Sequence, residues 1–366
     1  MRPVMSLRSL AVLVAVVALG KTQVQAGPGD LLLTFQNPTP ASGDWFGWSV
    51  AGVGNNVLVS AIYDDTGGTN AGAAYLLNGS TGALLRTFQK PTPAAGDYFG
   101  WSVAAVESNV LVGACNDDTG ATNAGAVYLF EGSTGALLRT FQKAVPVAND
   151  LFGRSVAAVG NNVLVGAPND DTGAGDTGAA YLFNGSTGAL LRTFQNPTPA
   201  DSDYFGRSVA DVGSNVLVGA DGDDTGASNA GAAYLFNGST GALLRTFQNP
   251  TPAVNDYFGT SVAAVGNNVL VGAPNDDTGA ANAGAAYLFD GSTGALRWTF
   301  QNPTPAADDY FGESVAAVGR NVLVGARGDD TGKLNSGSAY LFQVPEPATL
   351  ALLALGGLAM VRRRRK

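Results

Sequence analysis

Six adjacent pairs of aspartates are the residues of this sequence best suited to binding chemistry. The pairs are Asp64/Asp65, Asp117/Asp118, Asp170/Asp171, Asp223/Asp224, Asp276/Asp277 and Asp329/Asp330, and Thr-Gly follows each of them. Clustered carboxylates can hold Ca²⁺, a hard cation that takes about 6–8 oxygen ligands. However, an Asp pair followed by Thr and Gly is not a known ligand spacing. The interpretation that the sequence favours is that each Asp accepts backbone N–H bonds in a turn and keeps the protein soluble.

Several kinds of chemistry are excluded by composition. The chain has no His, which excludes His-based acid–base catalysis and His metal sites. Its single cysteine, Cys115, allows no internal disulfide. Two carboxylates could hydrolyse glycosides, but sixfold repetition of one pattern is not how a single active site is built. Residues 27–343 carry 12 Lys and Arg against 28 Asp and Glu, which argues against binding nucleic acid.

A repeat of 53 residues positions the aspartates. Phe-Gly recurs at Phe46, Phe99, Phe152, Phe205, Phe258 and Phe311. Each unit holds four short runs rich in Val, Leu, Tyr and Phe, and turn residues such as Gly160-Asn161-Asn162 separate them. Four antiparallel strands per unit is the design of a propeller blade. The sequence therefore predicts an all-β fold, a six-bladed β-propeller over residues 31–343.

The two ends of the array predict how the propeller closes. Leu31–Gln36 matches Leu84–Gln89, the fourth strand of the first unit, 53 residues later. The sixth unit ends after its third run, at Phe342. We therefore expect the N-terminal strand to pair with Ser338–Phe342 and to complete the last blade, which removes two open sheet edges.

Alternating strand direction predicts that one face of the propeller is acidic. The Asp pairs follow the second strand, and a further Asp precedes each Phe-Gly, so both sets fall on the same face. This second set is Asp44, Asp97, Asp150, Asp203, Asp256 and Asp309. Trp45, Trp48 and Trp101 flank the same face. They could be carbohydrate platforms, although packing between blades is the simpler role.

The units resemble FG-GAP repeats, which form the blades of the integrin α-subunit propeller and of many bacterial surface proteins. The matching pieces are Asp97-Tyr98-Phe99-Gly100 with Ser102-Val103-Ala104, and Val165-Gly166-Ala167-Pro168, which recurs as Val271–Pro274. The chain departs from the family in lacking the Asp-x-Asp-x-Asp-Gly calcium loop between the first and second strands. It also has six blades where integrins have seven. The family's metal ligands therefore do not carry over to this chain.

The first 26 residues are typical of a secretory signal peptide. Arg2 and Arg8 form a positive start, Leu10–Leu19 is the apolar run, and Val24-Gln25-Ala26 offers small residues for cleavage. The apolar run is too short to span a membrane. We expect cleavage before Gly27.

Residues 344–366 resemble the PEP-CTERM sorting signal of Gram-negative bacteria. Pro345-Glu346-Pro347 is followed by a short apolar stretch and by Arg362–Lys366. The resemblance implies an exosortase as processing partner, transient membrane association, and release or attachment at the cell exterior. The alternative is a plain tail anchor.

These patterns together predict a non-enzymatic binding or structural module at the exterior of a bacterium. The loops on one propeller face would contact polysaccharide or another protein. A calcium-dependent adhesin is the first alternative, and an enzyme that processes extracellular matrix is the second.

Overall fold

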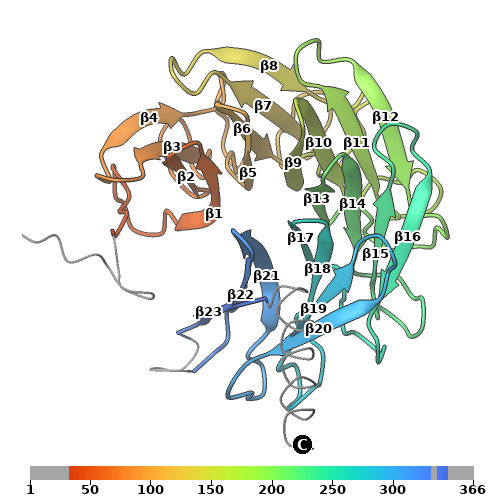
Figure 1. Cartoon of the computed structure of the whole chain (residues 1–366). Coiled ribbons are helices and arrows are strands. Elements are labelled where there is room, and N and C mark those ends of the chain that lie inside the picture. The colour runs from red at the N-terminus through yellow and green to blue at the C-terminus, as the bar shows by residue number, and fades with distance from the viewer. Residues whose placement is uncertain (1–32, 331–335, 345–366) are drawn as a thin grey trace, which may run out of the picture. The chain divides into compact units, whose positions relative to one another are not determined.

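The computed structural model describes residues 33–330 and 336–344. Of the two units into which the chain divides, 1–34 and 35–366, the second contains every strand of the described residues. The predicted signal peptide and the Pro345-Glu346-Pro347 motif lie outside the described residues. The described residues form 23 strands in six antiparallel sheets and no helix (Figure 1). The prediction of an all-β, six-bladed β-propeller is confirmed.

The strands follow the chain order within each sheet. The first blade consists of β1 (Phe46–Val53), β2 (Asn56–Ala61), β3 (Ala73–Asn78) and β4 (Leu84–Phe88). The second consists of β5 (Ser102–Val106), β6 (Asn109–Ala114), β7 (Ala126–Phe130) and β8 (Leu137–Phe141). The third consists of β9 (Ser155–Val159), β10 (Asn162–Ala167), β11 (Ala179–Asn184) and β12 (Leu190–Gln195). The fourth consists of β13 (Ser208–Val212), β14 (Asn215–Ala220), β15 (Ala232–Phe236) and β16 (Leu243–Gln248). The fifth consists of β17 (Ser261–Val265), β18 (Asn268–Ala273), β19 (Ala285–Asp290) and β20 (Leu296–Gln301). The sixth has β21 (Phe311–Val318), β22 (Asn321–Ala326) and β23 (Ser338–Phe342).

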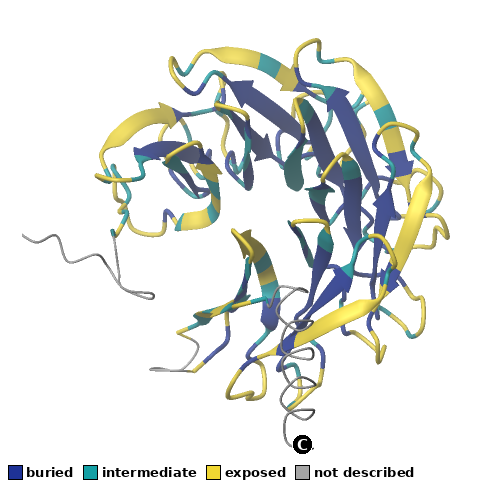
Figure 2. Ribbon diagram, viewed as in Figure 1, coloured by how far each residue is buried: buried dark blue, intermediate teal, exposed yellow. Residues whose placement is uncertain are grey.

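The first strands of successive blades contact one another, and the fourth strands lie outermost (Figure 1). In the first five blades the second and third strands are almost wholly buried, whereas the fourth strands are largely exposed; in the sixth blade β22 and β23 are more exposed (Figure 2). This explains why the second and third strands are continuous apolar runs. A strand buried on both faces carries no alternation of polar and apolar residues.

The hydrophobic core lies between neighbouring blades. Leu217 and Phe247 of the fourth blade pack in one cluster with Val271 and Tyr287 of the fifth. Close approach of the backbones requires glycine in the loop before each third strand. At Gly231 (φ +81°), a Cβ atom would lie 2.1 Å from the carbonyl oxygen of the Phe258 Phe-Gly motif.

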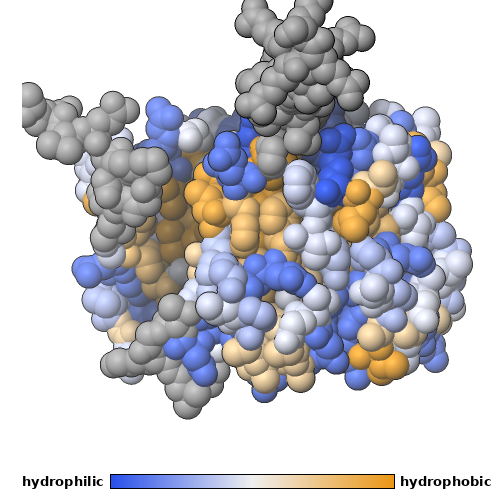
Figure 3. All heavy atoms as spheres, turned by 60° about the horizontal axis from the view of Figure 1, so that its bottom comes forward, coloured by the Kyte–Doolittle hydropathy of each residue, from blue (hydrophilic) through white to orange (hydrophobic). Residues whose placement is uncertain are grey.

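Phe35 lies against the first blade at the place where the fourth strand of a preceding blade would pack. Phe35 packs with the cluster around Tyr75 and Leu77, as Phe88, 53 residues later, packs between the first and second blades. On the sixth blade, Leu341 is 58% exposed, whereas its equivalent Leu76 is 3% exposed. Figure 3 views the side on which β21–β23 lie in Figure 1, and apolar residues gather in the middle of that surface.

The third strand of the sixth blade thus exposes an apolar side chain that the equivalent strand of the first blade buries. This agrees with the closure that the sequence predicts. Closure itself stays a prediction, since Leu31 and Leu32 lie outside the described residues.

Deleting residues 31–36 is expected to lower the free energy of unfolding by about 3 kcal/mol or more. The deletion removes Phe35, which is half-buried here and which closure of the ring would bury, and loss of a buried phenyl ring has about this cost. It also opens the edge of β23 to other chains. Denaturant unfolding and size-exclusion chromatography measure both effects, and deletion of residues 27–30 is the control. A deletion variant that stays monomeric with an unchanged melting temperature would contradict closure.

Candidate functional site

A buried polar bridge joins each blade to the next. Asn196, in the link before the fourth blade, donates from Nδ2 to Asp203 Oδ2 (2.7 Å) and to Asp223 Oδ2 (2.9 Å). The Tyr234 hydroxyl of β15 donates to the same oxygen of Asp223, and the Thr225 amide donates to Asp223 Oδ1. We call this arrangement the junction bridge. It brings together the Asp before Phe-Gly and the first Asp of the pair, as the strand order predicts.

The junction bridge recurs with either Asn or Lys at its centre. Asn249 and Asn302 make the same two bonds at the next two junctions. At the junction before the second blade, Lys90 Nζ lies 3.1 Å from Asp97 and 2.9 Å from Asp117. Lys143 lies 2.7 Å from both of its carboxylates. Two carboxylates and one donor are therefore a constant feature of the described junctions.

Twelve of the eighteen predicted site aspartates are buried, which differs from the exposed acidic face that the sequence predicts. They are Asp44, Asp64, Asp97, Asp117, Asp150, Asp170, Asp203, Asp223, Asp256, Asp276, Asp309 and Asp329, each no more than 6% exposed. The reason is that the loops fold over the junctions, where buried backbone and side-chain donors need acceptors. In this position the twelve carboxylates stabilise contacts between blades.

The other six predicted site aspartates, the second member of each pair, are exposed. They are Asp65, Asp118, Asp171, Asp224, Asp277 and Asp330. In five blades Oδ1 of this residue accepts a hydrogen bond of 2.7–2.9 Å from the backbone amide five residues later. The acceptors of these bonds are Asp65, Asp118, Asp171, Asp224 and Asp277. The turn-forming interpretation is thus confirmed for these five loops.

The two aspartates of a pair have different surroundings. The first is buried in a junction, whereas the second is exposed, as at Asp64 and Asp65, Asp223 and Asp224, Asp276 and Asp277, and Asp329 and Asp330. The physical reason is that successive residues of a turn point their side chains in different directions. Within the described ranges, no group of three or more His, Cys, Asp or Glu side chains could hold a metal ion. Calcium binding by the Asp pairs stays a prediction.

The two carboxylates of a bridge ionise differently. At the Lys junctions burial raises the pKa of the Asp before Phe-Gly, Asp97 or Asp150, whereas the pKa of the first Asp of the pair is lowered. Burial, and then the nearby carboxylates Asp223 and Asp276, raise the pKa of Asp203 and of Asp256 to about 6. At the Lys90 junction burial acts in the same direction. There, hydrogen bonds from Thr119, Tyr128 and Lys90 outweigh it and lower the pKa of Asp117.

A ring of unlike residues stands out against the near-identical blades. Asn-Val-Leu-Val-Gly-Ala forms the second strand of five blades, and only Ser60 interrupts it in the other. In contrast, the position after Phe-Gly holds Trp48, Trp101, Arg154, Arg207, Thr260 and Glu313. The position after the second strand holds Ile62, Cys115, Pro168, Asp221, Pro274 and Arg327. We call these positions, with the residue before each Phe-Gly, the central rim.

The residue before each Phe-Gly adopts a strained backbone conformation. These residues are Trp45, Tyr98, Leu151, Tyr204, Tyr257 and Tyr310, with φ between 51° and 54°. Bulky L-residues rarely occupy this left-handed region, and strain of this kind gathers at functional sites. The fold thus holds five aromatic side chains on the rim at a cost in backbone energy.

One half of the rim is an aromatic cluster. Trp45 and Trp48 stack with ring centroids 5.6 Å apart, and Trp48 meets Trp101 edge-on at 5.0 Å. Tyr63 and Tyr98 extend the cluster through contacts of 4.5 Å (Tyr63 to Trp45) and 6.0 Å (Tyr98 to Trp101). Trp45 is 54% exposed and Trp48 is 41% exposed. The three predicted tryptophans are therefore brought together, and two of them face solvent.

The other half of the rim is charged. The Arg154 guanidinium lies 4.4 Å above the Trp101 ring, and burial and then the charge of Arg207 lower its pKa to about 10. Arg207 Nε lies 3.5 Å from Asp221 Oδ2. Arg327 lies 4.4 Å above the Tyr310 ring and also contacts Glu313. Cys115 is buried, which raises the pKa of its thiol to about 12 and fits a structural role.

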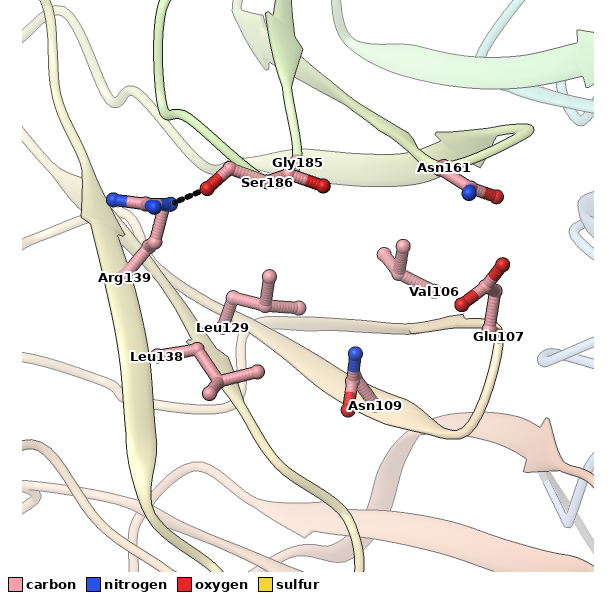
Figure 4. A pocket seen from close by; sticks show the side chains of 9 residues that line it. All are labelled: Val106, Glu107, Asn109, Leu129, Leu138, Arg139, Asn161, Gly185 and Ser186. Atoms are coloured by element: carbon pink, nitrogen blue, oxygen red, sulfur yellow. Dashed lines mark hydrogen bonds between the residues drawn. The ribbon is translucent and has the colours of Figure 1, made fainter.

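A cavity of about 260 Å³ on the opposite side of the blades holds one unlike residue, Glu107, where sister blades have glycine, as at Gly54 and Gly160 (Figure 4). It lies between the second and third blades, where Arg139 Nε donates to the Ser186 carbonyl oxygen at 2.6 Å. Arg86 makes the same bond to Ser133 one blade earlier. Because both the cavity and its hydrogen bonds recur with the repeat, they belong to the packing of the blades.

Sequence reasoning missed the charged half of the rim and the donors of the junction bridge. Both carry a signal at the 53-residue interval. Bridge residues recur as Asn or Lys, whereas rim residues differ from blade to blade.

No helix in the described part of the chain is long and apolar enough to cross a membrane.

Replacing Asp203 and Asp256 with Asn is expected to stabilise the protein at pH 7 and to change its stability little at pH 4.5. Folding raises the pKa of both carboxyls from 3.8 to about 6, so the folded state binds their protons more tightly. Wild-type stability from these groups therefore falls as the pH rises from about 4 to about 6, and Asn removes that loss. Urea unfolding at the two pH values measures the effect.

Asp117→Asn is the matched control, with the opposite sign. Because folding lowers the pKa of Asp117, its carboxylate contributes stability at pH 7 that is lost only as the pH falls through the folded pKa. This variant should be less stable than wild type at both pH values. Equal effects of the Asp203 and Asp117 substitutions at pH 7 would contradict the account.

Comparison with known proteins places these features in a family. Residues 39–77, 92–130, 146–183, 198–236, 252–289 and 304–342 match the FG-GAP repeat, and residues 343–366 match the PEP-CTERM protein-sorting motif. Over 210 residues the chain is 28% identical to integrin alpha-2 of Bos taurus, covering 51% of this chain and 17% of that protein. The chain thus spans less than a fifth of that relative's length. The crystal structure of the computationally designed Ika8 protein has a similar fold, with a TM-score of 0.51 and 18% identity over 87% of this chain and 76% of that chain. Since six matched repeats cover most of the residues between the two terminal signals, the chain belongs to the FG-GAP repeat family.

Proposed function

We propose that the protein is a non-enzymatic binding module of the bacterial exterior whose aromatic rim cluster binds polysaccharide. The observation that carries the proposal is the confinement of Trp48 and Trp101, at the position after Phe-Gly, to two of six nearly identical blades. A packing role would recur in every blade, as the Phe-Gly phenylalanine does. An asymmetric cluster instead suits a single ligand.

The chemistry of the cluster fits a sugar chain. The apolar faces of pyranose rings stack on flat aromatic surfaces, and the phenol groups supply hydrogen bonds at the edges. The indole N–H of Trp48 donates to the Trp101 carbonyl oxygen (3.1 Å), which holds the ring in place for stacking. Stacked and edge-on rings in contact, such as Trp45, Trp48 and Trp101, offer an extended surface. The sorting motif supports this proposal, because it implies export to the surface or exterior, where polysaccharides are met.

Replacing Trp48 with Thr is expected to weaken binding at least tenfold for a matrix polysaccharide that the wild-type protein binds. Thr260 occupies the same position in the fifth blade, so the substitution suits the backbone. Trp298→Ala is the matched control, because Trp298 is similarly exposed, at 40%, but lies on the outer strand β20. Affinity electrophoresis against a panel of purified polysaccharides provides the measurement. Equal loss in both variants would contradict the aromatic site.

The same panel, run with Ca²⁺ and with a chelator, tests the calcium-dependent adhesin. If the adhesin interpretation holds, the chelator abolishes binding and substitution of the exposed Asp118 and Asp171 weakens it. If the aromatic cluster alone binds, the two conditions give equal affinities.

Mature protein from the native host should begin near Gly27 and lack Arg362–Lys366. The first expectation follows from the predicted signal peptide. The second follows from the sorting motif, which implies processing by an exosortase. Intact-mass measurement decides both, and a control strain without the exosortase should retain the basic tail. A mature mass that includes the tail in the native host would refute the processing.

A further inference from the structure

We propose that the charged half of the central rim is a subsite for a hexuronate, the carboxylate-bearing sugar unit of an acidic polysaccharide. This inference rests on the proposed function, since it names the class of polysaccharide that the neighbouring aromatic cluster binds. The subsite consists of residues at repeat positions that differ in type from blade to blade: Arg207, Asp221, Glu313 and Arg327.

The subsite is a cavity of about 390 Å³ formed by loops of the fourth, fifth and sixth blades. This volume lies in the range of pockets that hold small organic ligands. Three tyrosines, Tyr204, Tyr257 and Tyr310, line the cavity together with Arg207, Asp221 and Arg327. Aromatic walls with a few convergent polar groups are typical of a ligand site.

Asp221 lines this cavity with one unsatisfied oxygen. The side chain is 5% exposed, and its Oδ2 accepts a hydrogen bond of 3.2 Å from the Thr260 hydroxyl. Its Oδ1 is buried and has no hydrogen-bond partner among the residues that the structure describes. Buried acceptors are nearly always paired, because an unpaired one loses its hydration without compensation. A sugar hydroxyl in the cavity would supply the missing donor.

The equivalent positions show that Asp221 is not required by the fold. Pro168 and Pro274 occupy this place in the third and fifth blades, and neither side chain can accept a hydrogen bond. A buried carboxylate that replaces proline in one blade adds a desolvated charge. Its contacts with Arg207 (3.5 Å) and Thr260 (3.2 Å) use Oδ2 and leave Oδ1 without a donor, which a ligand would supply.

The guanidinium groups select a carboxylate on the ligand. Arg207 and Arg327 each contact a protein carboxylate through Nε, at 3.5 Å and 3.7 Å, in the described residues. These contacts do not use the paired Nη edge that binds carboxylates in a bidentate manner. Arg154 adds a third positive charge beside Arg207. Three guanidinium groups against Asp221 and Glu313 make this rim locally positive, although the chain carries a net charge of −9.

The combination favours a hexuronate over simpler anions. A hexuronate presents a planar carboxylate for an arginine edge, hydroxyl donors for Asp221, and a ring face for a tyrosine. Inorganic phosphate offers no apolar face to the three tyrosines. The unit could come from a polymer or from free monosaccharide, and the experiment separates the two sources.

The test measures binding of polyglucuronate, the same polymer after reduction of its carboxyl groups, and free glucuronate by calorimetry. Wild-type protein is expected to bind polyglucuronate at least tenfold more tightly than the reduced polymer. Arg207→Thr should remove that preference and leave the affinity for the reduced polymer unchanged, because Arg207 is assigned to the carboxylate. Asp221→Pro should weaken binding of both polymers, because Asp221 is assigned to a sugar hydroxyl that both of them carry. Both substitutions copy residues of sister blades. Melting temperatures close to wild type confirm that both variants are folded.

The outcomes separate the two proposals. Equal affinity of wild-type protein for the native and reduced polymers would overturn the hexuronate subsite and leave the aromatic site standing. Trp48→Thr should weaken binding of both polymers but leave the affinity for free glucuronate unchanged. Free glucuronate that binds while neither polymer does would support the subsite and reject polysaccharide as the ligand. An Arg207→Thr variant that keeps the tenfold preference would also overturn the subsite.

Discussion

Between successive blades, one Asn or Lys in the linking segment holds two buried carboxylates, and a tyrosine hydroxyl of the third strand completes this junction bridge at Asp223 and its equivalents. Buried carboxylates are costly unless they are paired, so the bridge tolerates little displacement of either blade. It fixes the link between blades, which in turn fixes the Phe-Gly turn and the residues on either side of it. The position of every rim side chain follows from that turn.

A scaffold held in this way leaves the central rim free to vary. Trp48, Arg207 and Glu313 occupy one position of the repeat, yet the second strands of their blades differ only at Ser60, which replaces a glycine. The left-handed conformation before Phe-Gly is likewise constant, although its residue is Trp45, Leu151 or a tyrosine. The backbone is therefore specified by the bridge and the core, and binding chemistry can change through side chains alone.

Charge is distributed between these two features in an unexpected way. Most of the aspartates of the blades lie inside junctions or in turns, where hydrogen bonds to backbone and side-chain donors offset their burial. Three arginines meet on one side of the rim, and Asp221 and Glu313 balance them only partly. An anionic ligand would thus meet a local positive potential on an acidic protein, and added salt would weaken that attraction.

The architecture could be predicted from the sequence, because the information that specifies it is periodic. The 53-residue interval, the four apolar runs and the turn residues specify six blades, and the spare run before Asn37 predicts how they close. The same periodicity placed the aspartates and the three tryptophans on one face. The tertiary structure alone decides which of those residues are exposed to solvent. Burial of Asp223, exposure of its neighbour Asp224 and exposure of Trp48 depend on how a loop folds over the neighbouring blade, and residues 27 or 53 positions apart then become partners. Strand periodicity carries no information about such contacts. For the same reason the grouping of Arg207, Asp221 and Arg327 around one cavity could not be predicted from the strands that hold them.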